Sequence, residues 1–245
     1  MKNILPDAVI DFLCIPLTAN VLENNTLINN IIKFDKKGKD KLNKLFEVIS
    51  IVRKNNYHII LTPHRSMRSA LITYFSKAPV KIGFDRNSLA FLLTKKVAYD
   101  INSHEIQRNL DLLSVIPGID LDDSKISSKA ILNPSEKDMK IVDSLIAQKE
   151  NIIVFAPCSK WFTKQITISK SIEITKAFIE KSYVVVLIGS GDDFNFCREM
   201  ERNTNSNIYS SGMGKLVNLC GRLSPLQSYY AINKAKVLIT VDSAT

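Results

Sequence analysis

Hydroxyl and ammonium groups suited to a diphosphate are gathered in the segment 158–165, CSKWFTKQ. The segment follows the apolar run 151–157 and precedes residues with helical spacing. Ser159, Thr163 and Lys164 fit negative charge, because a lysine and the backbone N–H groups of a helix N-terminus both attract phosphate. We therefore predict a diphosphate site here. The signal is weak by itself, since many loops of this kind contain Ser, Thr and Lys.

Two further polar positions follow apolar runs, as ligand-binding residues do at the carboxyl ends of parallel strands. Asp193 comes after the run 183–189, where a carboxylate either holds ribose hydroxyls or caps the next helix; the sequence leaves both open. Asp242 ends a third apolar run and is followed by Ser243. The single tryptophan, Trp161, is interpreted as a packing anchor in preference to a stacking platform.

Basic residues are concentrated in the first half of the chain. Between residues 33 and 96 there are 15 Lys or Arg against 4 Asp or Glu, a surplus of 11, whereas the net charge of the whole chain is +9. This surplus indicates either a solvated surface or a face for an anionic partner, such as a phosphorylated substrate or an anionic membrane leaflet. Nucleic acid is not favoured as a partner, because zinc-finger spacing and interleaved aromatic residues are absent from the sequence.

Composition excludes several classes of protein. The 245 residues are 45% hydrophobic and 23% charged, as in a globular protein with a substantial core. No apolar run approaches the ~18–20 residues of a membrane span. The four cysteines form no CxxC pair, so we expect no metal or iron–sulfur site and a reducing, cytoplasmic location. Neither GxxxxGK[ST] nor GxGxxG occurs, which argues against a P-loop NTPase or an ordinary dinucleotide dehydrogenase.

Short apolar runs alternate with stretches of helical spacing along the chain. In the first half we predict strands at 8–16, 28–34, 58–63 and 80–84, and helices at 41–54, 67–75 and around 105–115. In the second half we predict strands at 151–157, 183–189 and 237–242, and helices at 135–148, 168–181, 193–203 and 225–233. Strands separated by such helices favour parallel sheets. The polar segment 120–129 is expected to link two Rossmann-like α/β domains, residues 1–130 and 131–245.

Both domains are expected to be incomplete at the ends of this chain. The sequence stops three residues after Asp242, with no helix to cover the last strand. It begins with what we interpret as the tail of a helix leading into the run 8–16, whereas an open parallel sheet usually starts with a strand and a ligand-binding loop.

Several segments resemble one known family in the same order along the chain. The segments FAPCSKWFTKQ, VVVLIGSGDD and NLCGRLSPLQSYYAINKAKVLITVDSAT are similar to the donor domain of bacterial lipopolysaccharide heptosyltransferases, which are glycosyltransferases of family 9 with the GT-B fold. The segments NNYHIILTPHRSMRSALITYFSKAPVKIGFDR and HEIQRNLDLL are similar to the acceptor domain, and most resemble the heptosyltransferase II type. The resemblance covers nearly the whole chain, although no single motif in it is decisive.

The resemblance implies roles for individual residues. Lys164 would contact the donor diphosphate and Asp193 the donor nucleoside. The other residues implied on the donor side are Ser159 and Thr163 beside the phosphate, Leu223 against the adenine, and Asp242 and Ser243 near the phosphates and sugar. Those implied on the acceptor side are Arg65, Arg68, His104 and Arg108, suited to phosphate and carboxylate groups. Ala244 departs from the family, which usually has glycine there.

The resemblance also implies an activity. It is the inverting transfer of L-glycero-D-manno-heptose from ADP-heptose to the lipopolysaccharide inner core, without metal or cofactor, and with peripheral contact at the cytoplasmic face of the inner membrane. The family's general-base aspartate would lie before Met1, so we expect no catalytic base within this chain and an inactive fragment. Two alternatives remain open at this point. They are another GT-B enzyme that uses a different nucleotide sugar, and a nucleotide-sugar-binding fragment without activity.

Overall fold

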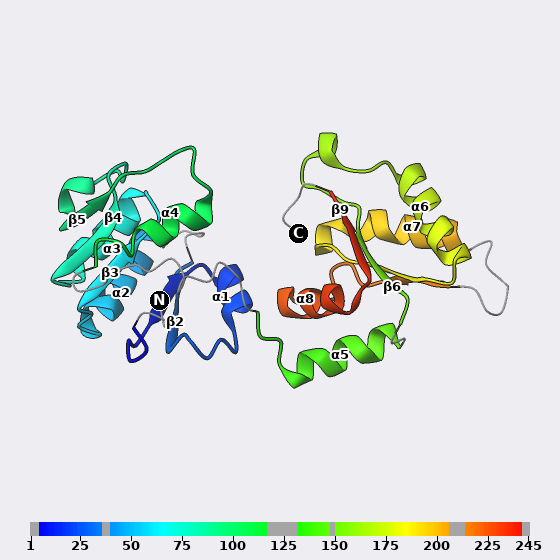
Figure 1. Cartoon of the computed structure of the whole chain (residues 1–245), viewed down its shortest axis with the longest axis horizontal. Helices are drawn as coiled ribbons and strands as arrows, with labels where there is room; N and C mark the ends of the chain where they lie inside the picture. Colours follow the sequence, from blue (N-terminus) through cyan, green and yellow to red (C-terminus); the bar gives the residue numbers. More distant parts are fainter. Residues whose placement is uncertain (1–4, 36–39, 117–131, 148–149, 206–213, 242–245) are drawn as a thin grey trace. The chain divides into compact units, whose positions relative to one another are not determined.

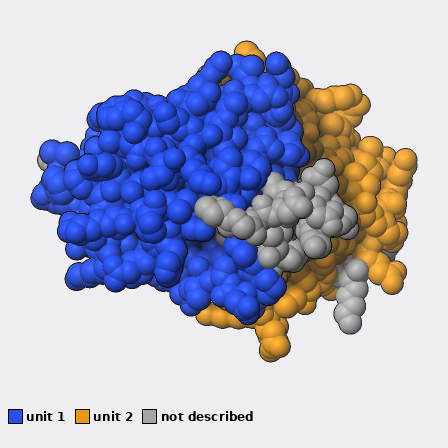
Figure 2. Space-filling view, turned by 60° about the vertical axis from the view of Figure 1, so that its left-hand side comes forward, with its two compact units in different colours: residues 1–19, 25–131 blue, residues 20–24, 132–245 orange. Residues whose placement is uncertain are grey.

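The computed structural model describes residues 5–35, 40–116, 132–147, 150–205 and 214–241. The chain divides into two compact units (Figure 2): residues 1–19 with 25–131, and residues 20–24 with 132–245. The expected linker 120–129 lies outside the described residues. A bilayer span needs ~20 apolar residues, and none of the helices in the described part of the chain is long and apolar enough to be one.

The first unit contains two parallel sheets. One pairs β1 (Asp11–Cys14) with β2 (Asn30–Lys33), and the other has the order β3 (Ile59–Thr62), β4 (Val80–Phe84), β5 (Lys95–Val97). The helices of this part of the chain are α1 (Pro16–Leu22), α2 (Lys41–Lys54), α3 (Met67–Phe75) and α4 (Glu105–Asp111), with a 3₁₀ turn, η1, at Ala90–Leu92.

Two apolar clusters hold the first unit together. Helix α2 buries one side, including Leu45 and Val48, against Ile32 of β2 and Ile72 of α3. On β4, Ile82 and Phe84 belong to a second cluster with the apolar residues that follow α4. The 3.6-residue spacing on α2 predicts this buried face, and packing of such faces supplies most of a helix's stability.

The second unit is a four-stranded parallel sheet with helices on both faces (Figure 1). The strand order is β8 (Lys215–Asn218), β7 (Val184–Leu187), β6 (Ile152–Ala156), β9 (Val237–Thr240). The helices are α5 (Glu136–Ile146), α6 (Ile168–Glu180), α7 (Phe194–Asn205) and α8 (Pro225–Lys234), with 3₁₀ turns η3 (Phe162–Lys164) and η4 (Gly191–Asp193).

Alternate residues of the central strands face opposite layers of helices. On β6, Val154 packs in a cluster with residues of α5 and α8, whereas Phe155 packs in another with residues of α6 and α7. Both side chains are fully buried. A strand covered on both faces therefore reads as the continuous apolar run IIVFA, without the alternation of a half-exposed strand.

Most of the predicted elements are confirmed, often one or two residues shorter. The Ser135–Asp138 capping box that begins α5 is confirmed as well. The sequence did not predict α1, β5 or β8. The run 8–16 contains a strand only at 11–14, since Pro16 already begins α1. The expected helix tail at the N-terminus is not present at residues 5–7, where Pro6 and Asp7 form a turn; residues 1–4 lie outside the described part.

Candidate functional site

The strand order of the second unit indicates which loop is placed to bind a ligand. The chain passes from β6 to β7 to β8 on one side and then crosses to β9 on the other side of β6. The topological switch point therefore lies between β6 and β9. In open parallel sheets, ligands bind outside the carboxyl ends of the strands at such a point. The loop that leaves β6 there, residues 157–167, contains Ser159, Thr163 and Lys164.

Backbone and side-chain hydrogen bonds fix the shape of this loop. The buried hydroxyl of Ser159 accepts a 3.2 Å hydrogen bond from the Trp161 N–H, and the Lys164 N–H donates to the Trp161 carbonyl at 2.9 Å. The Ile166 N–H returns to the Pro157 carbonyl at 3.3 Å and closes the loop. Ser159 therefore shapes the turn, while Thr163 and Lys164 lie exposed on the turn η3.

Helix α6 begins four residues after Lys164. Its N-cap residue, Thr167, has extended backbone geometry, and its hydroxyl makes no capping bond to the first turn. The N–H groups of that turn and the ammonium of Lys164 are two positive features on the same loop, as the sequence predicts for a diphosphate site. The interpretation of Trp161 as a packing anchor is wrong. Trp161 is 67% exposed, so it does not pack into the core.

Asp193 ends the turn η4, on the loop that leaves β7 next to β6. Its Oδ2 accepts two hydrogen bonds from Ser190, one from the backbone N–H and one from the hydroxyl, both 2.7 Å long. Of the two roles left open by the sequence, the capping role is therefore present in the structure. Asp193 is half-buried and lies at the carboxyl edge of the sheet.

The loops after β7 and β8 are in close contact at Gly189, Gly191 and Gly221. The Gly221 N–H donates to the Gly189 carbonyl at 2.9 Å, and Gly221 has a φ of +70°. A Cβ atom at Gly221 would lie 2.9 Å from the Cα of Gly191, so only glycine fits. Leu223, two residues later, is half-buried against the core cluster on the α5 and α8 side. This packing leaves only part of the Leu223 side chain for an adenine ring.

Three thiols that the sequence did not connect lie together beneath the Asp193 turn. The Sγ atoms of Cys197 and Cys220 are 2.7 Å apart, and both residues are fully buried. A hydrogen bond with Cys197, together with burial, raises the pKa of the Cys158 thiol far above its ordinary range. All three are free cysteines. The described residues contain no group of three or more Cys, His, Asp or Glu arranged to hold a metal.

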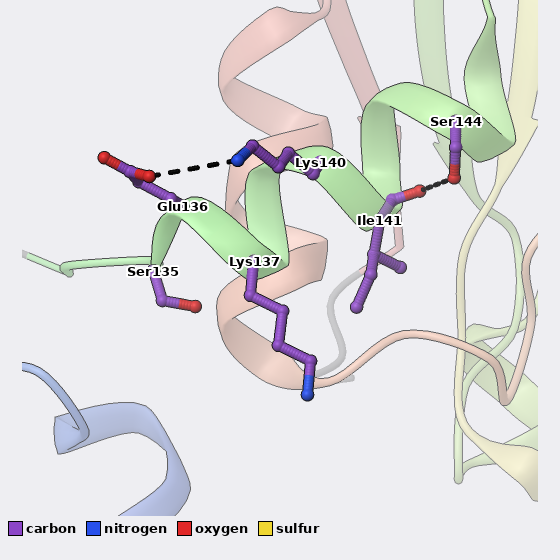
Figure 3. Close-up of a pocket in the computed structure, with 6 residues that line it drawn as sticks. All are labelled: Ser135, Glu136, Lys137, Lys140, Ile141 and Ser144. Atoms are coloured by element: carbon purple, nitrogen blue, oxygen red, sulfur yellow. Dashed lines mark hydrogen bonds and ion pairs between the residues drawn. The ribbon is translucent and has the colours of Figure 1, made fainter.

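A shallow hollow on the second unit lies along α5 and is not part of this site. It is lined by side chains of that helix and its N-cap Ser135 (Figure 3). Glu136 and Lys140 point toward each other there and form a 4.0 Å ion pair. Because these side chains are highly exposed and already paired, this surface lacks the fixed polar groups of a ligand site.

The predicted acceptor-side residues lie in the first unit, and two of them meet on one aromatic ring. The loops that leave β3, β4 and β5 share the carboxyl edge of their sheet and carry Arg65, Asp85 and Tyr99 respectively. The Cζ atoms of Arg65 and Arg108 lie 4.1 and 4.7 Å from the centre of the Tyr99 ring. The sequence predicted the two arginines but not the ring between their segments.

Hydrogen bonds and an ion pair hold the Arg108 guanidinium in place, whereas Arg65 is exposed. The Arg108 guanidinium donates to the carbonyls of Asp100 at 3.0 Å and Ser103 at 2.7 Å and is paired with Glu105. Its side chain is only 12% exposed. The hydrogen bond from Arg108 lowers the pKa of Glu105. Arg108 therefore braces the segment 100–105, and this leaves Arg65 as the guanidinium best placed to meet a ligand.

Of the other two residues predicted on the acceptor side, His104 has a structural role and Arg68 is half-buried. His104 is the N-cap of α4, where its Nδ1 accepts a 3.2 Å hydrogen bond from the Ile106 N–H. Arg68 is half-buried in the first turn of α3. Asp242 and Ser243, predicted on the donor side, lie outside the described residues. The structure thus joins Arg65 to Arg108 through Tyr99, and it places Asp193 beside the loop that carries Lys164.

Known proteins match this chain over most of its length. The model of glycosyltransferase family 9 (heptosyltransferase) matches residues 45–245. Lipopolysaccharide heptosyltransferase 3 of Escherichia coli (strain K12) is 24% identical over all of this chain and 71% of its own length.

Solved structures share the fold. A glycosyl transferase of family 9 from Veillonella parvula DSM 2008 has a TM-score of 0.80 at 19% identity, over 96% of this chain and 67% of its own. The E. coli ADP-heptose LPS heptosyltransferase II has a TM-score of 0.75 at 20% identity, over 97% and 71%. The E. coli heptosyltransferase WaaC with ADP-2-deoxy-2-fluoro heptose has a TM-score of 0.72 at 11% identity, over 99% and 76%.

Proposed function

This chain belongs to glycosyltransferase family 9, the heptosyltransferases, and on that basis we propose that the full-length protein transfers L-glycero-D-manno-heptose from ADP-heptose to the inner core of lipopolysaccharide, with inversion at the anomeric carbon. In this proposal residues 131–245 bind the donor and residues 1–130 bind the acceptor. The acceptor carries a lipid anchor, so the reaction would take place at the cytoplasmic face of the inner membrane.

The observation that carries the proposal is the loop 157–167 at the switch point of the second sheet. It combines an exposed lysine, Lys164, with the N-terminus of α6, which has no side-chain cap. In an inverting transfer the bond between the anomeric carbon and the diphosphate oxygen breaks as the acceptor oxygen attacks, and the acceptor hydroxyl loses its proton to a base, a role that we assign to no residue of this chain. Negative charge therefore grows on the leaving ADP. Fixed positive groups at that oxygen stabilise the transition state more than the ground state.

Neighbouring loops supply the remaining donor contacts in this proposal. Asp193 would hold the ribose of the nucleoside through its carboxylate, and the exposed part of Leu223 would pack against adenine. Ser159 contributes by fixing the turn that presents Thr163 and Lys164. A related solved structure, WaaC, contains an ADP-heptose analogue, which supports an ADP-linked heptose as the donor.

On the acceptor side, Arg65 and Arg68 would bind anionic groups, while His104 and Arg108 hold the segment 100–108 in place. Arginine suits this role because its planar guanidinium makes two parallel hydrogen bonds to a phosphate or carboxylate. The basic surplus between residues 33 and 96 supports an anionic acceptor for the same unit.

A donor panel tests the proposal. Binding of ADP-heptose, ADP-glucose and UDP-glucose to the purified chain is measured by isothermal titration calorimetry, and ADP-heptose should bind most tightly. Lys164→Ala should weaken the binding of all ADP sugars. Lys181→Ala, at the exposed far end of α6, is the matched control and should leave it unchanged. Preference for a UDP sugar would contradict the proposed donor.

A further inference from the structure

We propose that Tyr99 is a positioning residue, which holds the guanidinium of Arg65 so that it binds an anionic group, a phosphate or a carboxylate, of the acceptor. The identity of the acceptor rests on the proposed function, but the geometry of the pair does not. The sequence did not single out Tyr99. Its ring contacts both arginines, but we assign anion binding to Arg65 and a structural role to Arg108.

Tyr99 is fixed on several sides. Its N–H donates a 2.9 Å hydrogen bond to Oδ1 of Asp85, and the Asp85 N–H donates to the Val97 carbonyl at 2.9 Å. Its ring meets Phe84 edge to face, with centroids 5.2 Å apart and an interplanar angle of 88°. These contacts join the loops after β4 and β5, so the ring is a rigid surface at the carboxyl edge of the sheet.

The loop that carries Arg65 is tied to the same edge. The Arg65 carbonyl accepts two hydrogen bonds from Ser88, one from its N–H at 3.1 Å and one from its hydroxyl at 3.0 Å. The Nδ2 of Asn87 donates to the His64 carbonyl at 3.2 Å. The backbone of Arg65 is therefore anchored, and the Tyr99 ring restrains its guanidinium 4.1 Å from the ring centre.

Arg65 acts on one nearby carboxylate, since its charge helps Arg108 to lower the pKa of Glu105, but Glu105 is ion-paired with Arg108 and not with Arg65. Arg108, also packed on Tyr99, is paired with Glu105. Among the described residues no carboxylate lies within 4.0 Å of the Arg65 guanidinium. A guanidinium stacked on a ring keeps the N–H groups of its edge directed outward, where they can bind a planar or tetrahedral anion. Restraining the arginine before binding also reduces the entropy cost of ordering it.

A purely structural role for Tyr99 is the alternative, because the ring also packs against the apolar cluster of β4. Two variants separate these roles. Tyr99→Phe keeps the aromatic face and removes only the hydroxyl, whereas Tyr99→Leu keeps apolar bulk and removes the face. If the ring acts through Arg65, the leucine variant is impaired and the phenylalanine variant is rescued.

In a transfer assay of the full-length protein, Tyr99→Leu should raise the acceptor KM by ~3–30-fold, the scale of a cation–π contact, and leave the donor KM within about twofold. Tyr99→Phe should stay within about twofold of wild type for both. The double variant Tyr99→Leu/Arg65→Gln should be no worse than Arg65→Gln alone, because the two residues act as one unit. Multiplication of the two single effects, or an equal loss in Tyr99→Phe, would overturn the proposal.

A second measurement is independent of turnover. In an NMR titration with inorganic phosphate, the side-chain Nε–Hε signal of Arg65 should shift in wild type and in Tyr99→Phe, and respond several-fold more weakly in Tyr99→Leu. If wild type transfers no heptose but this pattern holds, the proposed function fails and the positioning role stands. If Arg65 responds equally in all three proteins, Tyr99 does not position it, whatever the activity.

Discussion

The hydroxyl and the backbone N–H of Ser190 both donate to a single carboxylate oxygen of Asp193, at 2.7 Å each. This relationship makes Asp193 part of the turn that it would use to hold the donor. The same carboxylate would therefore stabilise the turn and bind the donor. Variants of Ser190 and of Asp193 can separate these two roles.

Ser190→Ala removes one of the two bonds and should lower the free energy of unfolding by about 1 kcal/mol, the usual value of a lost cap. It should leave the affinity for ADP nearly unchanged. Asp193→Ala should lower stability similarly and also weaken ADP binding, because it removes the proposed ribose contact. Denaturant unfolding and calorimetry measure the two effects. Equal ADP affinity in both variants would show that Asp193 only caps the turn and does not contact ADP.

In the full-length protein, Lys164→Ala should lower turnover by ~10²–10³-fold, the scale for losing one transition-state charge contact. The cause is loss of the ammonium group that opposes the charge developing on ADP. Steady-state kinetics with ADP-heptose measure this, with Lys181→Ala as the control. Near-normal turnover of the Lys164 variant would show that the diphosphate does not lie at η3.

Arg108→Gln should destabilise the chain more than Arg65→Gln does, because it leaves the carbonyls of Asp100 and Ser103 and the carboxylate of Glu105 without their charged partner. Arg65→Gln should lower stability by only about 0.5–1 kcal/mol, the value of a cation–π contact at an exposed position. Arg53→Gln, exposed at the end of α2, is a matched control. Thermal unfolding compares the three. A larger loss in Arg65→Gln than in Arg108→Gln would contradict the division of roles.

Tyr57 gives the first unit a specific sensitivity to alkaline pH. Burial and the 2.5 Å hydrogen bond that its hydroxyl donates to Asp11 raise the pKa of Tyr57 from 10 to about 12. A raised pKa stabilises the folded state fully below pH 10, and this contribution is lost as the pH rises to about 12. Between pH 10 and 12 the melting temperature of wild type should therefore fall more steeply than that of Tyr57→Phe. Parallel curves would contradict this.

Sequence patterns predicted the buried elements well because burial leaves a clear apolar signal. Helix α2 and strands β6 and β7 show it plainly, and the resemblance to family 9 is confirmed by the match to residues 45–245. Strand β5, with the sequence KKV, carries too little apolar signal to be predicted, and a short strand such as β8, KLVN, is little better. Their places are set by pairing with neighbouring strands.

The candidate site was predicted less completely than the fold. Residue type and position after a strand were enough to select Lys164 and Asp193, whereas Arg65 was selected through the resemblance to family 9. They could not show that Arg108 is enclosed by carbonyls or that Tyr99 lies against both arginines, since these contacts join loops from different strands. An aromatic residue directly after β5 was the available signal for Tyr99, but β5 itself had not been predicted.

Heptose transfer can be measured directly in one assay. The full-length protein that contains residues 1–245 is incubated with ADP-heptose and a heptose-deficient lipopolysaccharide core, and the product is analysed by mass spectrometry. Matched reactions contain ADP-glucose or UDP-glucose. We expect addition of one heptose with ADP-heptose, release of ADP in equal amount, and no addition with the other donors. Transfer from UDP-glucose, or release of ADP without any gain in acceptor mass, would contradict it.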